Sequence, residues 1–134
     1  MPAFAAPAGW VALGALPAAA LLGAALRRRR GARLALRMRP HVALGYAALA
    51  CAVVHAMWSM RALASADARG NAFGAAALAA FFAQAFAGAS LLDPGAYRNA
   101  LRRWHVVIFW SVLGLALAHV VLDAPYLQGM SAVP

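Results

Sequence analysis

The sequence contains few charged residues and very few acidic ones. Only 11% of its 134 residues are charged, and the acids are Asp67, Asp93 and Asp123. An ordinary soluble domain has about 25% charged residues and about 50% apolar residues. Here 66% of the residues are hydrophobic and the mean hydropathy is +0.74. This composition disfavours a soluble globular enzyme and a disordered chain alike.

Cysteine is also scarce, since the chain has only Cys51. This count excludes a disulfide framework within the chain and a zinc site built from cysteines. Because Cys51 lies in a stretch rich in alanine and valine, we expect it to be a buried and unreactive thiol.

Long apolar stretches make up most of the sequence. Four of them are close to the roughly 20 residues that a helix needs to cross a bilayer, and they run over about 10–26, 41–60, 72–92 and 104–122. Their lengths exclude membrane β-strands, and their alanine and leucine content favours helices. The sequence therefore predicts an all-α, integral membrane four-helix bundle that forms a single domain over 1–134. Asp123 is expected to cap the end of the fourth span.

The twelve basic residues, all arginine, are distributed unevenly among the connections. Seven lie in the Arg27–Arg39 connection and three lie between the third and fourth spans, whereas only Arg61 and Arg69 lie on the other side. The positive-inside rule predicts a cytoplasmic Arg27–Arg39 loop and both termini outside, and we expect a bacterial inner membrane. No basic residue precedes the first span, so we expect it to be a retained helix rather than a signal peptide. Because the arginines flank apolar segments, no nucleic-acid partner is expected.

The four histidines form two matched pairs. His41 and His55 lie on the second span and His105 and His119 on the fourth, and each pair is separated by 14 positions. Fourteen residues make almost four helical turns, so both members of a pair lie on nearly the same face, about 21 Å apart along the axis. The second and fourth spans run in the same direction. His41 is therefore predicted to lie level with His105, and His55 level with His119.

Two facing imidazoles at each level indicate a haem. A closed zinc site needs four converging ligands, which two pairs about 21 Å apart do not provide. Imidazole is also a ligand of iron, and one histidine from each of two helices supplies both axial ligands of a haem. We predict two b-type haems, one held by His41 and His105 and the other by His55 and His119. Small residues on the His41 face, such as Gly45, would leave room for a flat group.

Polar residues near the histidines are candidates for further contacts. Arginine pairs well with carboxylates, and the arginines that flank the pairs are Arg37, Arg39, Arg102 and Arg103 on the predicted cytoplasmic side and Arg61 on the other. We predict Arg39, Arg103 and Arg61 as residues that contact haem propionates, although topology and solvation explain most arginines in the connections. Gln84, an isolated polar residue in the third span, is predicted to make either an interhelical hydrogen bond or a contact with a quinone.

The pattern His41-x13-His55 followed by His105-x13-His119 resembles that of dihaem transmembrane cytochromes b. Two families share it: the haem-bearing four-helix bundle of quinol-oxidising cytochrome b, and the ferric-reductase-like transmembrane domain. The resemblance covers about 41–123 and implies two bis-histidine haems that carry electrons. In the ferric-reductase-like family the ligand helices begin on the cytoplasmic side, as predicted here. The flavin and nucleotide domain of the NADPH-dependent reductases and the quinol-site motif of cytochrome b are not found in this sequence.

These features predict an electron-transfer subunit of an oxidoreductase complex, with no complete active site of its own. Its donor and acceptor would be protein partners or a quinone. Two alternatives are open. One is a non-redox subunit of a membrane complex, whose histidines make interhelical hydrogen bonds. The other is a small metal or proton carrier, although no acidic residue lies in the middle of a span, where a cation path would be expected to use one.

Overall fold

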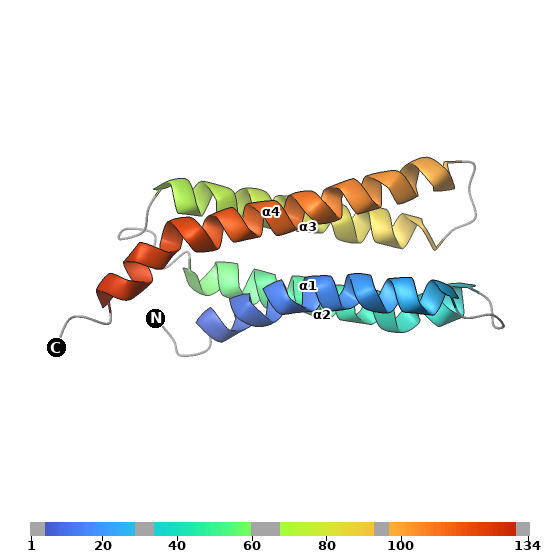
Figure 1. The fold of residues 1–134 in the computed structure, drawn as a ribbon, viewed down its shortest axis with the longest axis horizontal. Coiled ribbons are helices and arrows are strands. Elements are labelled where there is room, and N and C mark those ends of the chain that lie inside the picture. Colours follow the sequence, from blue (N-terminus) through green and yellow to red (C-terminus); the bar gives the residue numbers. More distant parts are fainter. Residues whose placement is uncertain (1–4, 29–33, 60–67, 93–96, 131–134) are drawn as a thin grey trace.

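The protein is built from four helices. A computed structural model describes residues 5–28, 34–59, 68–92 and 97–130. The helices are α1 (Ala5–Arg28), α2 (Leu34–Ser59), α3 (Ala68–Ser90) and α4 (Arg98–Met130). They alternate in direction, so α1 begins and α4 ends at the same end of the bundle (Figure 1). The predicted all-α four-helix bundle is therefore confirmed.

Each helix is long and apolar enough to cross a membrane. The candidate spans are Ala6–Arg28, Leu36–Ser59, Ala68–Ser90 and Arg98–Asp123. At most 28% of the apolar window of any span is buried inside the protein. Large apolar side chains such as Leu21 and Phe86 lie on the outer surface, where they are 73% and 76% exposed. Such a continuous apolar surface is suited to lipid rather than water, so the chain is an integral membrane protein.

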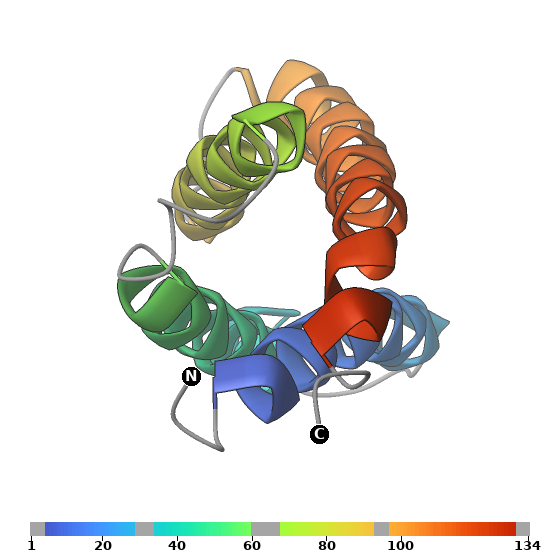
Figure 2. The ribbon, with the colours of Figure 1, turned by 90° about the vertical axis from the view of Figure 1, so that its left-hand side faces the viewer.

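The helices are arranged as two hairpins. The helix α1 packs along α2, and α3 packs along α4, whereas the two hairpins contact each other less closely, mainly through α2 and α3. Viewed along the bundle, the four helices form a ring in which α2 and α4 lie diagonally opposite each other (Figure 2). Residues on the inner faces of α2 and α4 therefore approach each other across the interior of the ring.

A small apolar core closes the middle of the ring. Its buried members come from all four helices, and they are Leu16, Ala48, Leu49, Phe81 and Val112. Ala48 lies midway between the two histidines of α2, and Val112 lies midway between those of α4. Both are only 1% exposed. The core therefore separates the two levels of the bundle at which the histidines lie.

The helices extend beyond the predicted spans at the arginine-rich end. The predicted Arg27–Arg39 loop is largely helical, because α1 continues to Arg28 and α2 begins at Leu34. Pro40 is the seventh residue of α2. It removes the helical hydrogen bond to the carbonyl four residues earlier without ending the helix. The prediction of a long basic loop was wrong because arginine forms helices readily once the apolar span has ended.

The helix bounds also differ at the other end and at the end of the third span. The helix α4 continues past Asp123 and through Pro125 to Met130, so these residues end the apolar span but not the helix. The third predicted span ran to Leu92, whereas α3 ends at Ser90 and a turn follows. Met60, the last residue of the second predicted span, lies outside the described residues.

Candidate functional site

The four histidines face one another in two pairs across the interior of the ring. The ring centroids of His41 and His105 lie 6.3 Å apart with an interplanar angle of 75°. Those of His55 and His119 lie 6.1 Å apart at 67°. Each pair joins α2 to α4, and all four residues are partly buried. The structure thus brings the histidines together at the two levels that their register predicted, about 21 Å apart along the bundle.

Each histidine packs on a glycine of the other helix in its own hairpin. In the first hairpin His41 lies on Gly23 and His55 on Gly9, and in the second His105 lies on Gly88 and His119 on Gly74. A Cβ added at any of these glycines would lie 2.9 to 3.2 Å from the nearest ring atom, which is closer than ordinary van der Waals contact. By contrast, a Cβ at Gly14 or Gly114 would meet nothing within 4 Å. The close approach of the rings therefore requires glycine at the four contact positions.

The glycines and histidines occupy equivalent positions in the two hairpins. Gly9 and Gly23 are 14 positions apart, as are Gly74 and Gly88, and this is also the separation within each histidine pair. Gly74 follows Gly9 by 65 positions, and His105 follows His41 by 64. The second hairpin thus repeats the first in the same orientation. These glycines were not among the predicted site residues, although their spacing equals that of the histidines and could have revealed them.

Backbone carbonyls orient two of the imidazole rings. His41 Nδ1 lies 2.8 Å from the carbonyl oxygen of Ala19, and His119 Nδ1 lies 2.9 Å from that of Gly70. A carbonyl oxygen only accepts hydrogen bonds, so each ring donates its Nδ1–H, and Nε2 of the neutral imidazole keeps its lone pair. Each of these carbonyls lies four residues before the contact glycine. The ring therefore lies on the glycine and reaches the carbonyl one helical turn away.

Gln84 gives His105 a different hydrogen bond. Gln84 is only 9% exposed, and its Nε2 lies 3.3 Å from His105 Nε2. The amide nitrogen donates, so His105 Nε2 accepts. Within the described part of the chain, Gln84 Oε1 and His105 Nδ1 are buried without a hydrogen-bond partner. The interhelical hydrogen bond predicted as one role of Gln84 is present, and a quinone contact stays a prediction.

A cavity of about 470 Å³ adjoins His41 and His105. Its polar lining residues, besides the two histidines and Gln84, include Arg27, Arg98, Asn99 and Arg102. This volume lies within the range of about 300–1,000 Å³ that is usual for small-molecule and cofactor sites. Gly45, which was expected to leave room for a flat group, lines the cavity, and a Cβ there would meet nothing within 4 Å. The cavity is thus roomy, largely apolar and basic.

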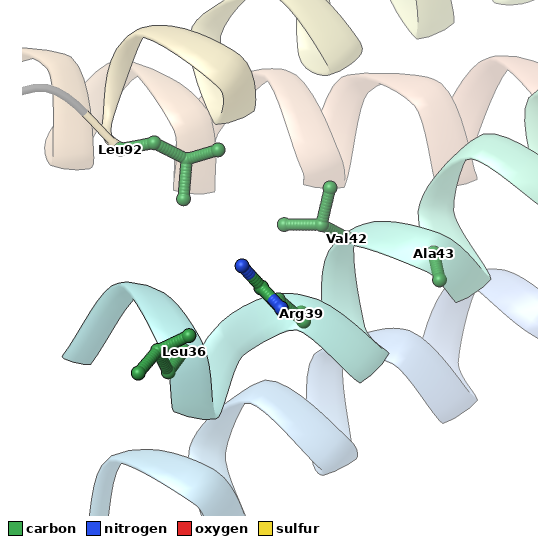
Figure 3. A pocket seen from close by; sticks show the side chains of 5 residues that line it. All are labelled: Leu36, Arg39, Val42, Ala43 and Leu92. Atoms are coloured by element: carbon green, nitrogen blue, oxygen red, sulfur yellow. The ribbon is translucent and has the colours of Figure 1, made fainter. Parts of the chain in front are cut away.

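The arginines that sequence reasoning singled out lie elsewhere. Arg39 is exposed and lines a separate depression of about 380 Å³ with Leu36, Val42, Ala43 and Leu92 (Figure 3). Arg103 is exposed and does not line the cavity beside His41, whereas its neighbour Arg102 does. Arg61 lies outside the described residues. Arg27 and Arg98 were missed because the helices that carry them continue beyond the apolar spans.

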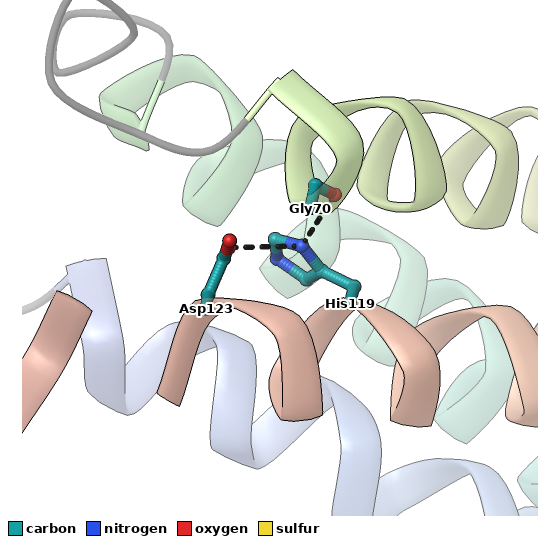
Figure 4. Close-up of polar contacts among 3 residues, drawn as sticks. All are labelled: Gly70, His119 and Asp123. Carbon is teal, nitrogen blue, oxygen red and sulfur yellow. Dashed lines mark hydrogen bonds and ion pairs between the residues drawn. The ribbon is translucent and has the colours of Figure 1, made fainter. Parts of the chain in front are cut away.

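Asp123 lies beside His119. Its Oδ2 atom is 3.1 Å from His119 Nδ1, so the ring has a carboxylate as well as a carbonyl within reach (Figure 4). The sequence predicted only a capping role for this residue. Its contact with His119 follows from a spacing of four positions on one helix, whereas its approach to Gly70 of α3 is not specified by sequence spacing.

Each level of the bundle offers two imidazoles as metal ligands. Within the described residues, no group of three or more His, Cys, Asp or Glu side chains is placed to hold a metal ion. A pair suits a haem, because the macrocycle itself supplies the remaining ligands of the iron. Comparisons of the chain with protein-family models, curated proteins and solved structures find no match. Any functional assignment therefore depends on the chemistry and geometry of the histidines and their surroundings.

Proposed function

We propose that this chain is a membrane electron-transfer subunit with two b-type haems, one held by His41 and His105 and the other by His55 and His119. The separation of the paired rings carries the proposal. A metal–imidazole nitrogen bond is about 2 Å long and the nitrogen lies about 1.1 Å from the ring centre, so two imidazoles on opposite sides of one metal have centroids about 6 Å apart. The two observed separations are 6.3 and 6.1 Å.

The hydrogen bonds of the rings also support ligation through Nε2. A histidine that binds a metal usually donates its other ring N–H to a carbonyl or carboxylate, which fixes the tautomer and the ring orientation. His41 and His119 make this hydrogen bond through Nδ1. His105 Nε2 accepts a hydrogen bond from Gln84, so this nitrogen also has a lone pair available. Ligation there would replace the contact with Gln84.

The surroundings of the rings fit a large flat group with carboxylate substituents. The contact glycines let each ring lie close against its neighbouring helix. At the level of His41 and His105, the cavity is apolar with Arg27, Arg98 and Arg102 along it. These three arginines are suited to pair with propionates. When bound, each haem would supply a reversible one-electron carrier, and the two sites would connect the two faces of the membrane.

The arginine distribution supports an orientation with the arginine-rich end in the cytoplasm. Arg27, Arg28, Arg98, Arg102 and Arg103 lie on the helix ends that meet at this end of the bundle. By the positive-inside rule, the level of His41 and His105 would be the cytoplasmic one, with both termini outside. We propose a bacterial inner membrane as the location of the chain. Its electron donor and acceptor would be protein partners or a quinone at the two faces.

Spectra of the purified chain, made with ample haem, test this proposal. A reduced-minus-oxidised difference spectrum should show b-type haem bands. Carbon monoxide should not change the reduced spectrum, because both histidines of each pair would hold the iron and leave no ligand position free. A large change with carbon monoxide would contradict bis-histidine ligation. A well-folded preparation without haem would contradict the proposal as a whole.

A second candidate function is that of a non-redox subunit in a membrane complex. The hydrogen bonds from His41 to Ala19 and from His119 to Gly70 favour it, because each joins two helices. Such bonds contribute about 0.6–2 kcal/mol each in a membrane protein. This candidate gives no role to the close approach of His41 to His105 and of His55 to His119 across the ring. It predicts a colourless protein, whose absorption is unchanged when a histidine is replaced.

A further inference from the structure

The surroundings of Nδ1 differ between His119 and His41. His119 Nδ1 lies 2.9 Å from the carbonyl oxygen of Gly70, which accepts its hydrogen bond, and 3.1 Å from the charged Oδ2 atom of Asp123 (Figure 4). His41 Nδ1 has the carbonyl oxygen of Ala19 as its hydrogen-bond partner. A negative charge beside an N–H group attracts the partial positive charge of its hydrogen. The carboxylate therefore makes the Nδ1–H of His119 more strongly polarised than that of His41.

The carboxylate of Asp123 lies against the start of α3. Its Oδ1 atom lies against Gly70, where an added Cβ would overlap it, so the absence of a side chain at Gly70 permits the contact. Gly70 is the third residue of α3, and the free N–H groups of a first helical turn favour an anion beside them. The side chains of His119 and Asp123 are 22% and 24% exposed. Partial burial strengthens the effect of the carboxylate on the ring.

This carboxylate makes the two otherwise similar sites unequal. Asp123 follows His119 by four positions, which is about one helical turn. The residues at the corresponding positions after the other three histidines are Gly45, Ser59 and Phe109. Among the described residues, the lining of the cavity at the opposite level includes Arg27, Arg98 and Arg102 and no acidic side chain. One site thus has a carboxylate beside a ligand candidate, and the other is lined by arginines.

We infer that Asp123 is a positioning residue that sets the reduction potential of the haem held by His55 and His119 below that of the haem held by His41 and His105. The inference rests on the proposed function. The carboxylate beside the Nδ1–H of His119 makes Nε2 a stronger electron donor, and its negative charge favours ferric over ferrous iron. The arginines at the other level have the opposite effect. Electron flow from the terminal end of the bundle to the arginine-rich end is then thermodynamically downhill.

A redox titration of the two haems in Asp123→Asn tests this inference. The variant removes the negative charge beside His119 Nδ1, so the lower of the two potentials should rise. We expect about a tenfold change in the equilibrium constant for reduction of that haem, which is 59 mV for a one-electron couple. The other potential should not change. Ser59→Ala, at the corresponding position of α2, is the matched control and should change neither potential.

Two further variants separate this role from a general effect on folding. Asp123→Glu keeps the charge and should leave the potential closer to that of the original chain than Asp123→Asn does. Gly70→Ala keeps Asp123 but displaces its carboxylate, so the same potential should rise. Two bound haems whose potentials are unchanged in both Asp123→Asn and Gly70→Ala would overturn the inference and leave the proposed function intact. A well-folded original chain without haem would instead overturn the proposed function, and the inference with it.

Discussion

Replacement of Gly23 by alanine is expected to displace His41 and destabilise the bundle. The added Cβ would lie 3.0 Å from Nδ1, 3.2 Å from Cε1 and 3.4 Å from Cγ of His41. The ring has little freedom to move away. Its Nδ1 is held 2.8 Å from the carbonyl oxygen of Ala19, one turn before Gly23 on the same helix. Relief of the overlap would therefore weaken this hydrogen bond or separate α1 from α2.

The magnitude follows from three terms. Alanine favours a helix over glycine by up to about 1 kcal/mol. Overpacking at a tight contact costs about 1–3 kcal/mol, and loss of the interhelical hydrogen bond of His41 adds about 0.6–2 kcal/mol. Gly23→Ala should therefore lower the free energy of unfolding by about 1–3 kcal/mol, and it should reduce haem occupancy between His41 and His105.

Unfolding of the purified chain by a denaturing detergent in mixed micelles provides the assay, with Gly14→Ala as the matched control. Gly14 lies on the same helix, is exposed, and has nothing within 4 Å of an added Cβ. This control should gain only the helix-forming preference of alanine. If the two variants unfold alike, the close packing of His41 on Gly23 does not contribute to stability, and the role assigned to the contact glycines is wrong.

Three further predictions concern the ligands, the basic cavity and the orientation in the membrane. His41→Ala and His55→Ala should each remove one haem and leave the other, as counted from the haem absorbance per chain; loss of both or of neither would contradict two independent sites. Arg102→Gln should weaken haem retention beside His41, measured by transfer to apomyoglobin, whereas Arg39→Gln, in the separate depression, should not; equal effects would remove the distinction between the two arginines. A cysteine introduced as Arg103→Cys should react with a membrane-impermeant thiol reagent only after the membrane is permeabilised so that the reagent reaches the cytoplasmic face. Labelling of this cysteine in intact cells would contradict the proposed orientation.

The number of helices and the level of the histidines could be predicted because both follow from periodicity along the chain. A stretch of about 20 apolar residues is recognisable without knowledge of its neighbours. The 14-residue separation in each pair corresponds to almost four helical turns. His41 and His55 therefore had to lie on the same face of their helix, whatever the orientation of that helix in the bundle. Two parallel helices with the same spacing then placed the pairs level with each other.

The helix bounds and the surroundings of the histidines were less predictable. Hydropathy locates the end of an apolar span, but a helix continues readily through arginine residues. The helical positions of Arg27 and Arg37 were therefore not predicted. The contact between Asp123 and Gly70 joins residues 53 positions apart and depends on how α3 and α4 rotate against each other. The contact glycines had a signal in their 14-residue spacing. Because the chain has 11 glycines, a 14-residue spacing between two of them is informative only when it is compared with the same spacing between the histidines.

The most direct test of the central claim is a pyridine haemochrome count on the purified chain, made with ample haem and related to an independent protein determination. The two histidine pairs, with ring centroids 6.3 and 6.1 Å apart, predict two b-type haems per chain. A count of one would contradict the equivalence of the two levels as ligand sites. A count of zero in a well-folded preparation would contradict the claim that these pairs bind haem and would favour the structural subunit.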